Sequence, residues 1–157
     1  MDARDREGNH PGDDAPSGSR PQATSAHGAG IPVLAAVIRR DGRYLVARRT
    51  AHRRHGGLWE FPGGKLLAGE SWLDAARREL AEELAVTAVA AREPLLHVRD
   101  PGSAFIVAFV GVDIVGDPVL REHSALRWAT PAELGDLDLA PADRVFVETM
   151  ARHSCGD

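Results

Sequence analysis

The chain has 157 residues, and its 19 basic and 23 acidic side chains give a formal net charge of −4. This length suits one domain with a hydrophobic core, and the acidic balance argues against a protein that binds duplex nucleic acid through a basic stripe. The single cysteine, Cys155, excludes a disulfide framework or a cysteine-based zinc site within one chain. No apolar run is long enough to span a bilayer, and the N-terminus lacks the apolar core of a signal peptide, so we expect a cytoplasmic protein without a membrane partner.

Residues 1–30 are rich in Gly, Pro, Ser, Asp and Arg and contain almost no large apolar side chains. Such a segment cannot bury enough surface to offset the entropy lost on ordering the chain. We therefore predict a disordered N-terminal extension over residues 1–30 and a folded domain over residues 31–155.

Strands and helices are both predicted from Ile31 onward. The run from Val33 to Ile38 is nearly all apolar, which is typical of a strand covered on both faces, and the Asp41-Gly42 pair predicts a tight turn into a second strand. Further strands are predicted over 58–61, 94–98, 105–115 and 125–128, and helices over 72–84, from 130, and over 141–152, the last with Val145, Phe146, Thr149 and Met150 facing inward. This mixture indicates a layered α/β or α+β sandwich.

The predicted helix over residues 72–84 carries an unusual concentration of negative charge. Ser71 is a suitable N-cap, and Leu73, Ala76, Leu80 and Leu84 form an apolar stripe for the core. Glu79, Glu82 and Glu83 are neighbours on the helix surface, and each like-charge pair costs about 0.2–0.5 kcal/mol. One interpretation is a solvated face with Arg77 and Arg78 as partners. The other is a site for Mg²⁺, which prefers carboxylate oxygens together with substrate phosphates.

A Pro62-Gly63-Gly64-Lys65 loop precedes the acidic helix, and Lys65 is the only lysine in the chain. Glycines let the backbone approach a phosphate closely, and a lysine adds a positive charge. Alone this loop is compatible with an ordinary turn. Beside a carboxylate-rich helix at short spacing, it favours the metal and phosphate interpretation.

The spacing from Gly64 to Glu70 and on to the segment Arg78-Glu79-Leu80-Ala81-Glu82-Glu83 resembles the Nudix box. One departure is Ala85, where the family usually has a glycine that eases a left-handed helix cap. The resemblance extends over roughly residues 31–155. The stretches Trp59–Lys65, Gly116-Asp117-Pro118, Glu122 with Trp128, and Leu139–Asp143 are similar to the MutT-type branch, which hydrolyses nucleoside triphosphates.

The resemblance implies a Nudix α/β/α sandwich around a central mixed sheet, and hydrolysis of a nucleoside diphosphate linked to another group with Mg²⁺ or Mn²⁺. By position it implies Glu79, Glu82, Glu83 and the Gly63 carbonyl as metal ligands, and Arg78 as the residue that orients the glutamates. Glu70 would lie outside the ligand shell or at its edge. Glu122 matches a loop glutamate that binds metal or acts as general base, and Glu82 competes for the role of base.

The substrate contacts that the resemblance implies are less definite. Lys65 and Arg49 would hold phosphates, although Arg49 equally fits a surface arginine at a strand end. Phe61 would line the base pocket or simply pack in the core. Asp143 stands where the branch has a base-reading residue, and as an ionised acceptor it would suit donors on cytosine, adenine or guanine; its alternative is a helix cap. The loop over residues 99–104 has no arginine where an 8-oxoguanine-specific member has one, since Arg99 is offset.

These patterns predict a Mg²⁺-dependent enzyme that converts (deoxy)nucleoside triphosphates to monophosphate and pyrophosphate. Removal of oxidised nucleotides such as 8-oxo-dGTP, a role in DNA repair, is one form of this activity. The alternatives are a pyrophosphatase for ADP-ribose or another nucleotide sugar, and a non-catalytic nucleotide-binding module. The sequence leaves the oligomeric state open.

Overall fold

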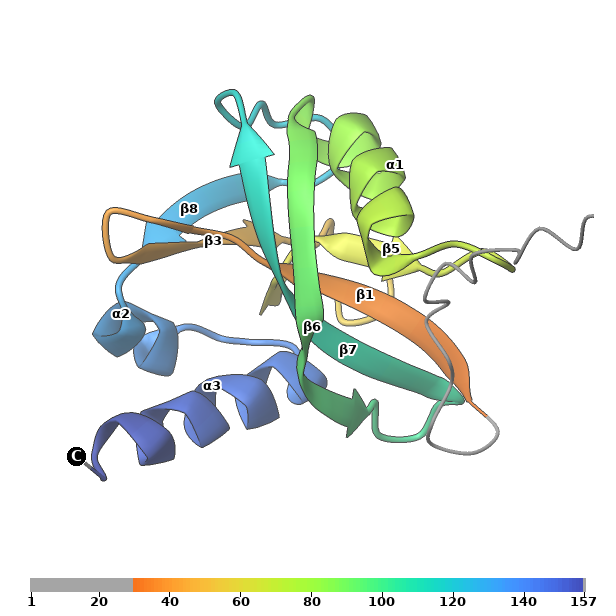
Figure 1. Cartoon of the computed structure of the whole chain (residues 1–157). Helices are drawn as coiled ribbons and strands as arrows, with labels where there is room; N and C mark the ends of the chain where they lie inside the picture. Colours follow the sequence, from red (N-terminus) through yellow and green to blue (C-terminus); the bar gives the residue numbers. More distant parts are fainter. Residues whose placement is uncertain (1–29, 157) are drawn as a thin grey trace, which may run out of the picture.

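The computed structural model describes residues 30–156, which form two sheets and three helices (Figure 1). The predicted extension therefore lies, except for Gly30, outside the described residues. One sheet has the strand order β5-β1-β7-β6, and in the other β3 pairs with β2, β4 and β8. The elements are β1 (Ile31–Val37), β2 (Arg39–Arg40), β3 (Arg43–Arg48), β4 (Trp59–Glu60), β5 (Gly63–Lys65), α1 (Trp72–Leu84), β6 (Thr87–Arg99), β7 (Phe105–Val115), β8 (Ala125–Ala129), α2 (Pro131–Asp136) and α3 (Pro141–Ser154).

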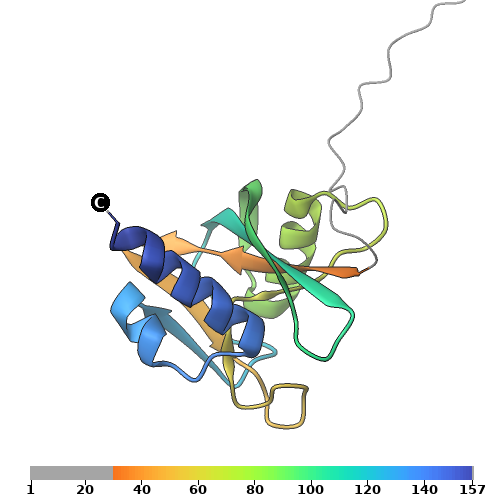
Figure 2. The same cartoon turned by 90° about the horizontal axis from the view of Figure 1, so that it is seen from below.

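Strand β1 is buried on both faces, as its apolar run predicts. It pairs in parallel with β7 and antiparallel with β5. Leu34 and Ala36 belong to the core cluster that includes the buried face of α1, whereas Ala35 and Val37 belong to the cluster that includes the buried side chains of α3. The helices α1 and α3 thus cover opposite faces of the first sheet (Figures 1 and 2), and the α/β layered fold is confirmed.

The Asp41-Gly42 turn forms as predicted, but it joins different strands. Asp41 and Gly42 both have positive φ, 51° and 74°, and connect β2 to β3. The expected direct hairpin of β1 with β3 is wrong, because the chain passes from one sheet to the other near Ile38. This crossing leaves the edges of β1 free to pair with β5 and β7.

The acidic helix begins and ends as predicted. Ser71 accepts a hydrogen bond from the Asp74 backbone N–H, and the Asp74 side chain accepts one from the Ser71 backbone, which completes a capping box. Ala85 ends the helix in the left-handed conformation, with φ 55° and ψ 33°. Ala85, which stands where the family usually has glycine, therefore adopts a left-handed conformation that glycine adopts with less strain.

Two expectations need correction. Strand β6 runs from Thr87 to Arg99 rather than over 94–98, because pairing with β7 extends it through register shifts and polar residues. In α3, Val145 is exposed, and Val147 is buried with Phe146 instead. Within residues 30–156, no helix is long and apolar enough to cross a membrane.

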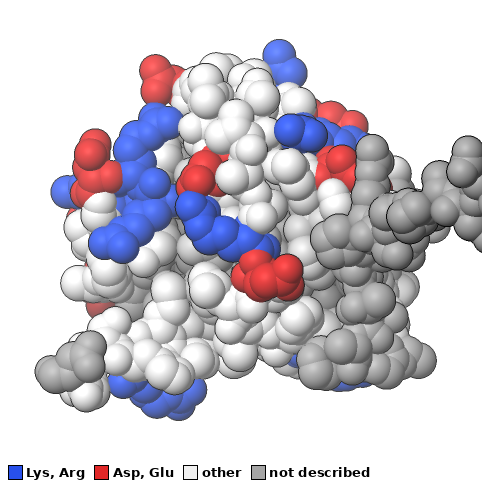
Figure 3. All heavy atoms as spheres, in the orientation of Figure 1, with Lys and Arg blue, Asp and Glu red and all other residues white. Residues whose placement is uncertain are grey.

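Charged side chains of both signs mix on the surface of the fold (Figure 3). Arg40 pairs with Asp117, and Arg43 pairs with Glu133. On β6 and β7, Arg92 and Asp113 form a two-pronged ion pair at 2.8 and 3.0 Å. Such pairing neutralises the arginines locally.

Candidate active site

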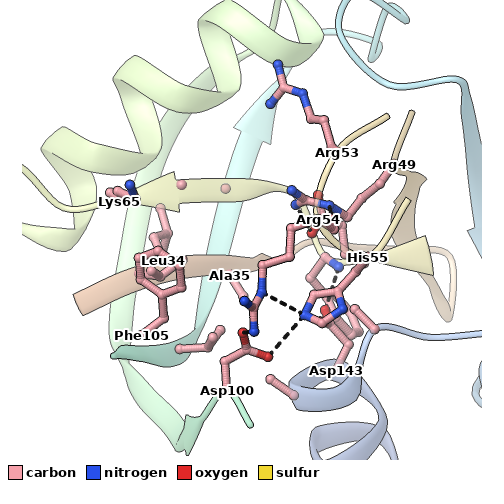
Figure 4. Close-up of a pocket in the computed structure, with 18 of the residues that line it drawn as sticks. Leu34, Ala35, Arg49, Arg53, Arg54, His55, Lys65, Asp100, Phe105 and Asp143 are labelled. Atoms are coloured by element: carbon pink, nitrogen blue, oxygen red, sulfur yellow. Dashed lines mark hydrogen bonds and ion pairs between the residues drawn. The ribbon is translucent and has the colours of Figure 1, made fainter. Parts of the chain in front are cut away.

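A cavity of about 390 Å³ lies where β1, β5, the loop after β3, the C-terminal part of α1 and the start of α3 meet. Figure 4 shows Lys65 and Phe105 at one side and Arg49, His55 and Asp143 at the other. The cavity brings together most of the predicted site residues: Arg49, Phe61, Gly63, Lys65, Glu79, Glu83, Glu122 and Asp143. Three others, Glu70, Arg78 and Glu82, lie outside its lining.

Two glycines of β5 allow the backbone and α1 to pack closely beside the cavity. A Cβ atom at Gly63 would overlap the Leu34 carbonyl on the neighbouring strand β1. A Cβ atom at Gly64 would overlap the carboxyl group of Glu79. Gly63 is therefore required by the backbone of β1, whereas a side chain at Gly64 would displace the Glu79 carboxyl group from its present position.

Arg78 is hydrogen-bonded to two of the acidic side chains, Glu70 and Glu79. Its guanidinium donates to both carboxylate oxygens of Glu70, at 3.0 and 2.8 Å, and to Glu79 Oε1 at 2.6 Å. It also donates to the Lys65 carbonyl at 3.0 Å. Hydrogen bonds from Arg78 lower the pKa of Glu70, so Glu70 acts as a support for Arg78. Arg78 thereby links the glycine loop to the first glutamate of the helix.

Glu83 is a buried carboxyl group with an incomplete set of partners. Its Oε2 atom has no hydrogen-bond partner among the described residues. Burial, and then the charges of Glu79, Glu60 and Glu122, raise its pKa to about 9. A bound cation would supply the missing partner and favour the ionised form. Glu83 therefore fits the role of a metal ligand.

The remaining predicted ligands are less closely gathered. Within residues 30–156, no three acidic, histidine or cysteine side chains form a metal-binding group. The reason is local: Glu79 is hydrogen-bonded to Arg78, and Glu82 and Glu122 are exposed to solvent. Burial, opposed by Arg78, raises the pKa of Glu79, with smaller contributions from Glu82 and Glu122, so these carboxylates do share one electrostatic environment.

The opposite end of the cavity joins an aromatic cluster to a buried acid. Phe61 makes edge-to-face contacts with Phe109 and Phe146 at 5.9 and 5.4 Å, and it also lines the cavity. Phe61 therefore packs in the core and also lines the cavity.

Asp143 lies beside this cluster, in the first turn of α3. It accepts a hydrogen bond from the Phe61 backbone N–H at 2.8 Å and is not the N-cap of α3, which is Ala140. Burial, and then the charge of Glu60, raise the pKa of Asp143 to about 8. This raised pKa favours the neutral form of Asp143 at neutral pH, whereas the sequence analysis considered the ionised form.

Glu60 and His123 are site residues to which the sequence analysis assigns no role. Arg49 donates to Glu60 Oε2 at 2.8 Å, and His123 Nε2 lies 3.1 Å from Glu60 Oε1. Arg49 is thus neither a free phosphate ligand nor a plain surface arginine. Glu60 stands in the quoted Trp59–Lys65 stretch, and His123 follows Glu122, but only the fold brings them together.

A second network closes one side of the cavity (Figure 4). Arg54 donates to Asp100 Oδ2 at 3.1 Å, and His55 Nε2 lies 3.4 Å from Asp100 Oδ1. These contacts join the loop after β3 to the turn between β6 and β7. At the other side, the Lys65 ammonium group lies 5.0 Å from the centre of the Phe105 ring.

Comparison with known proteins agrees with this geometry. The model of the NUDIX domain matches residues 29–150. The chain belongs to the Nudix family. Nudix enzymes act on small nucleotide substrates and use divalent metal ions, and the cavity lined by Glu79 and Glu83 is the candidate site for both.

Named relatives place the chain among MutT-like members of the Nudix family. It is 41% identical over 122 residues to a CTP pyrophosphohydrolase of Escherichia coli K12, covering 76% of this chain and 90% of the relative. It is 41% identical over 127 residues to a putative 8-oxo-dGTP diphosphatase 2 of Mycobacterium tuberculosis H37Rv, covering 76% and 87%. The solution structure of the E. coli ORF135 protein matches with a TM-score of 0.68 and 38% identity, covering 80% of this chain and 92% of that one. A MutT NUDIX hydrolase from Burkholderia pseudomallei matches with a TM-score of 0.66 and 30% identity, covering 75% and 95%.

Proposed function

We propose that this Nudix hydrolase converts nucleoside triphosphates to the monophosphate and pyrophosphate with Mg²⁺, for which Mn²⁺ can substitute, and that it prefers a cytosine base. One observation carries the proposal: a single cavity joins Glu79, Glu83 and Glu122 to Phe61 and Asp143. Binding of a nucleotide requires both groups of residues, because the phosphates require a cation and the base requires an apolar wall with a polar group. The substrate places the activity in the nucleotide pool of the cytoplasm.

The metal ligands in this proposal are Glu79, Glu83 and the Gly63 carbonyl, with Glu82 and Glu122 at the exposed side. When bound, the cation polarises phosphoryl oxygens and lowers the pKa of water in the site. Glu83 contributes a carboxylate that is already in place, since it is buried and its Oε2 atom has no hydrogen-bond partner among residues 30–156. Arg78 holds Glu79 against Gly64.

A carboxylate must accept the proton of the attacking water. Glu122 lines the cavity, whereas Glu82 does not. This placement supports Glu122 as the general base over Glu82.

Basic groups around the cavity would hold the phosphates. Lys65 lies beside β5, and Arg53 lines the cavity with an exposed side chain. Arg49 is engaged with Glu60, so it would bind a phosphate only while sharing that partner. We assign the leading phosphate contact to Lys65.

The protonation of Asp143 supports a preference for cytosine. A neutral carboxylic acid offers one donor and one acceptor, whereas an ionised one offers acceptors only. Cytosine presents an acceptor at N3 beside a donor at its amino group, which matches the neutral form. Asp143 Oδ1 already accepts from the Phe61 N–H, so the cytosine amino group would use the second lone pair of that oxygen while the protonated Oδ2 donates to N3. The E. coli relative is named a CTP pyrophosphohydrolase.

8-Oxo-dGTP is the second candidate, because the M. tuberculosis relative carries that name. The N1–H and amino donors of 8-oxoguanine suit an ionised Asp143. Arg99 does not line the cavity, so it offers the base no contact there. Hydrolysis of 8-oxo-dGTP would link the enzyme to DNA repair through cleansing of the nucleotide pool.

The test is a substrate panel with CTP, dCTP, dATP, dGTP, 8-oxo-dGTP and ADP-ribose, each with Mg²⁺ or Mn²⁺, and with products separated by chromatography. We expect CMP or dCMP with pyrophosphate at the highest kcat/KM. Faster cleavage of ADP-ribose would establish the nucleotide-sugar alternative. No cleavage of any compound, together with nucleotide binding, would establish a non-catalytic module.

A further inference from the structure

His123 is a largely buried residue in a loop that is otherwise mostly exposed. The loop over residues 116–124 connects β7 to β8, and its residues 119–122 and Ser124 are exposed. The His123 side chain is only 9% exposed and lines the cavity. The loop therefore turns one side chain inward immediately after Glu122.

The partner of His123 is fixed in a sheet. Its Nε2 atom lies 3.1 Å from Glu60 Oε1, and because a carboxylate only accepts, Nε2 donates. Glu60 lies in β4, which pairs with β3 through Ala47, and its other oxygen accepts from Arg49 at 2.8 Å. His123 is thus tied to a carboxylate that is carried by β4 and is also held by Arg49.

Packing alone does not explain a histidine at this position. The Nδ1 atom is buried and has no hydrogen-bond partner among residues 30–156. An unpaired buried nitrogen costs free energy, and an aliphatic side chain of similar size would fill the space without that cost. The side chain is better explained by its bond to Glu60.

This bond controls the position of Glu122. The Glu122 side chain makes no hydrogen bond or ion pair with another described side chain, so the backbone on either side must place it. On one side Arg121 reaches the Ala81 carbonyl at 3.3 Å, and on the other Ser124 donates from its backbone to the Arg48 carbonyl at 2.9 Å. His123 is the buried anchor between these two exposed contacts. Glu122 is near enough to raise the pKa of Glu79 and of Glu83.

We propose that His123 is a positioning residue that, through its hydrogen bond to Glu60, holds the Glu122 carboxylate beside Glu79 and Glu83. This inference rests on the proposed function only for the reaction; the placement of the loop is a property of the protein itself. It adds a residue outside the acidic helix to the active site. It also makes Glu60 a structural link between the loop that carries Glu122 and the Arg49 end of the cavity.

The experiment compares His123→Leu, His123→Gln, Glu122→Gln and the double variant His123→Leu/Glu122→Gln. The matched control is His153→Leu, which alters an exposed histidine near the end of α3. The readouts are kcat and KM for CTP with Mg²⁺, Mn²⁺ binding to the substrate-free protein by calorimetry, and hydrogen exchange of residues 116–124. Glutamine keeps an N–H donor for Glu60, whereas leucine does not.

We expect His123→Leu to lower kcat by about 10- to 100-fold with KM changed less than about threefold, since a misplaced group slows the chemical step. The loop should exchange faster and Mn²⁺ should bind more weakly, whereas His123→Gln and His153→Leu should stay near wild type. Because His123 acts through Glu122, the double variant should be no slower than Glu122→Gln alone.

The proposal would be overturned if the hydrogen exchange of the loop were the same in His123→Leu as in the wild type. It would also be overturned if the double variant had a kcat lower than that of Glu122→Gln by the full factor measured for His123→Leu alone. If the wild-type protein cleaves no triphosphate, the proposed function is wrong, but the proposed role of His123 is not thereby contradicted. Loop exchange and Mn²⁺ binding then decide the role of His123 without any assay of activity. If His123→Leu does not fold, His123→Gln against Glu60→Gln gives the same comparison, with only the latter expected to loosen the loop.

Discussion

Glu83 and Asp143 line one cavity, and the surroundings of both carboxyl groups favour their neutral form. Burial is the main cause for both, and it raises the pKa of Glu83 to about 9 and that of Asp143 to about 8. Glu60 raises both values further. The two groups differ in their partners: Glu83 has an oxygen without one among the described residues, and Asp143 accepts from Phe61. The first fits a cation and the second a base.

The pKa of Glu83 predicts how stability depends on pH in the presence of EDTA. The folded protein binds this proton more tightly than the unfolded chain does, whose value is near 4.5, so the free energy of unfolding falls as pH rises from 4.5 toward 9. Glu83→Gln removes this loss. We expect its Tm to exceed that of the wild type by several degrees at pH 8 and much less at pH 5, while hydrolysis falls at least about 100-fold. A difference in Tm that is the same at both pH values would contradict this.

The pKa of Asp143 predicts a change in base preference with pH. Below about 8 the acid is neutral and suits cytosine, and above it the ionised form suits guanine. The ratio of kcat/KM for dCTP over dGTP should fall about tenfold between pH 6.5 and 9.5, the scale of one hydrogen bond. Asp143→Asn cannot titrate but keeps an acceptor for the Phe61 N–H, so its ratio should stay level. Parallel slopes for the two proteins would refute this role.

At the scale of the element, α1 has a complete N-terminal cap but a strained residue at its C-terminal cap. The capping box of Ser71 and Asp74 satisfies backbone donors at the first turn. At the last turn Ala85 adopts φ 55°, a conformation that costs an alanine about 1 kcal/mol more than a glycine. The helix also ends without a basic residue in its last turn. Its position therefore depends on Leu80, Leu84 and the Arg78 network.

Ala85→Gly should raise the free energy of unfolding by about 1 kcal/mol and Tm by several degrees, because glycine accepts positive φ without strain. Thermal unfolding measures the effect, and kcat should remain within about twofold of the wild type. The control is Ala81→Gly, an exposed position inside the same helix, where the same substitution should destabilise by about 1 kcal/mol. Equal effects at the two positions would show that the cap conformation does not matter.

Strand β1 is buried on both faces, and this burial places α1 and α3 relative to the cavity. Its alternate residues pack toward α1 and toward α3, so the strand holds both helices in one frame. The Leu34 carbonyl of β1 fixes how close Gly63 must lie. The spacing between the metal end and the base end of the cavity is therefore set by a single buried strand.

At the scale of the molecule, the cavity needs both sheets. Gly63, Glu79 and Glu83 come from the side of the first sheet and α1, whereas Arg49, Glu60 and His123 come from the second sheet and its loops. The two sets meet through Glu60, whose charge reaches both Glu83 and Asp143. Loss of either sheet would remove one end of the substrate site.

Residues 1–29 lie outside the described part of the chain, and the strands and helices of the fold begin at Ile31. Deleting residues 1–29 should leave kcat/KM within about twofold and Tm within a few degrees of the full chain, since their composition lacks the apolar surface needed for docking. Kinetics and calorimetry on both proteins provide the comparison. A loss of tenfold in activity would show that this segment contributes to the domain.

Local chemistry allowed the acidic helix to be predicted to the residue, because its cap, apolar stripe and exit are all encoded within fifteen positions. The same holds for the Asp41-Gly42 turn, whose positive φ values belong to the two residues themselves. The pairing of β1 was mispredicted because its partner strand β7 lies more than seventy residues away. Val145 was predicted to face inward, whereas Val147 is the buried valine. Both side chains are apolar, so the sequence alone does not show which of them packs against the sheet.

The sequence by itself determined the family, the acidic helix, the glycines beside it and part of the residues that line the cavity. These follow from residue types at fixed spacing along one segment, or from a resemblance carried by such spacing. Only the tertiary structure decided that both oxygens of Glu70 accept from Arg78, that burial raises the pKa of Asp143 to about 8, and that His123 reaches Glu60 across 63 positions. The physical reason is that burial and charge at a side chain depend on neighbours from other elements, which no local pattern contains.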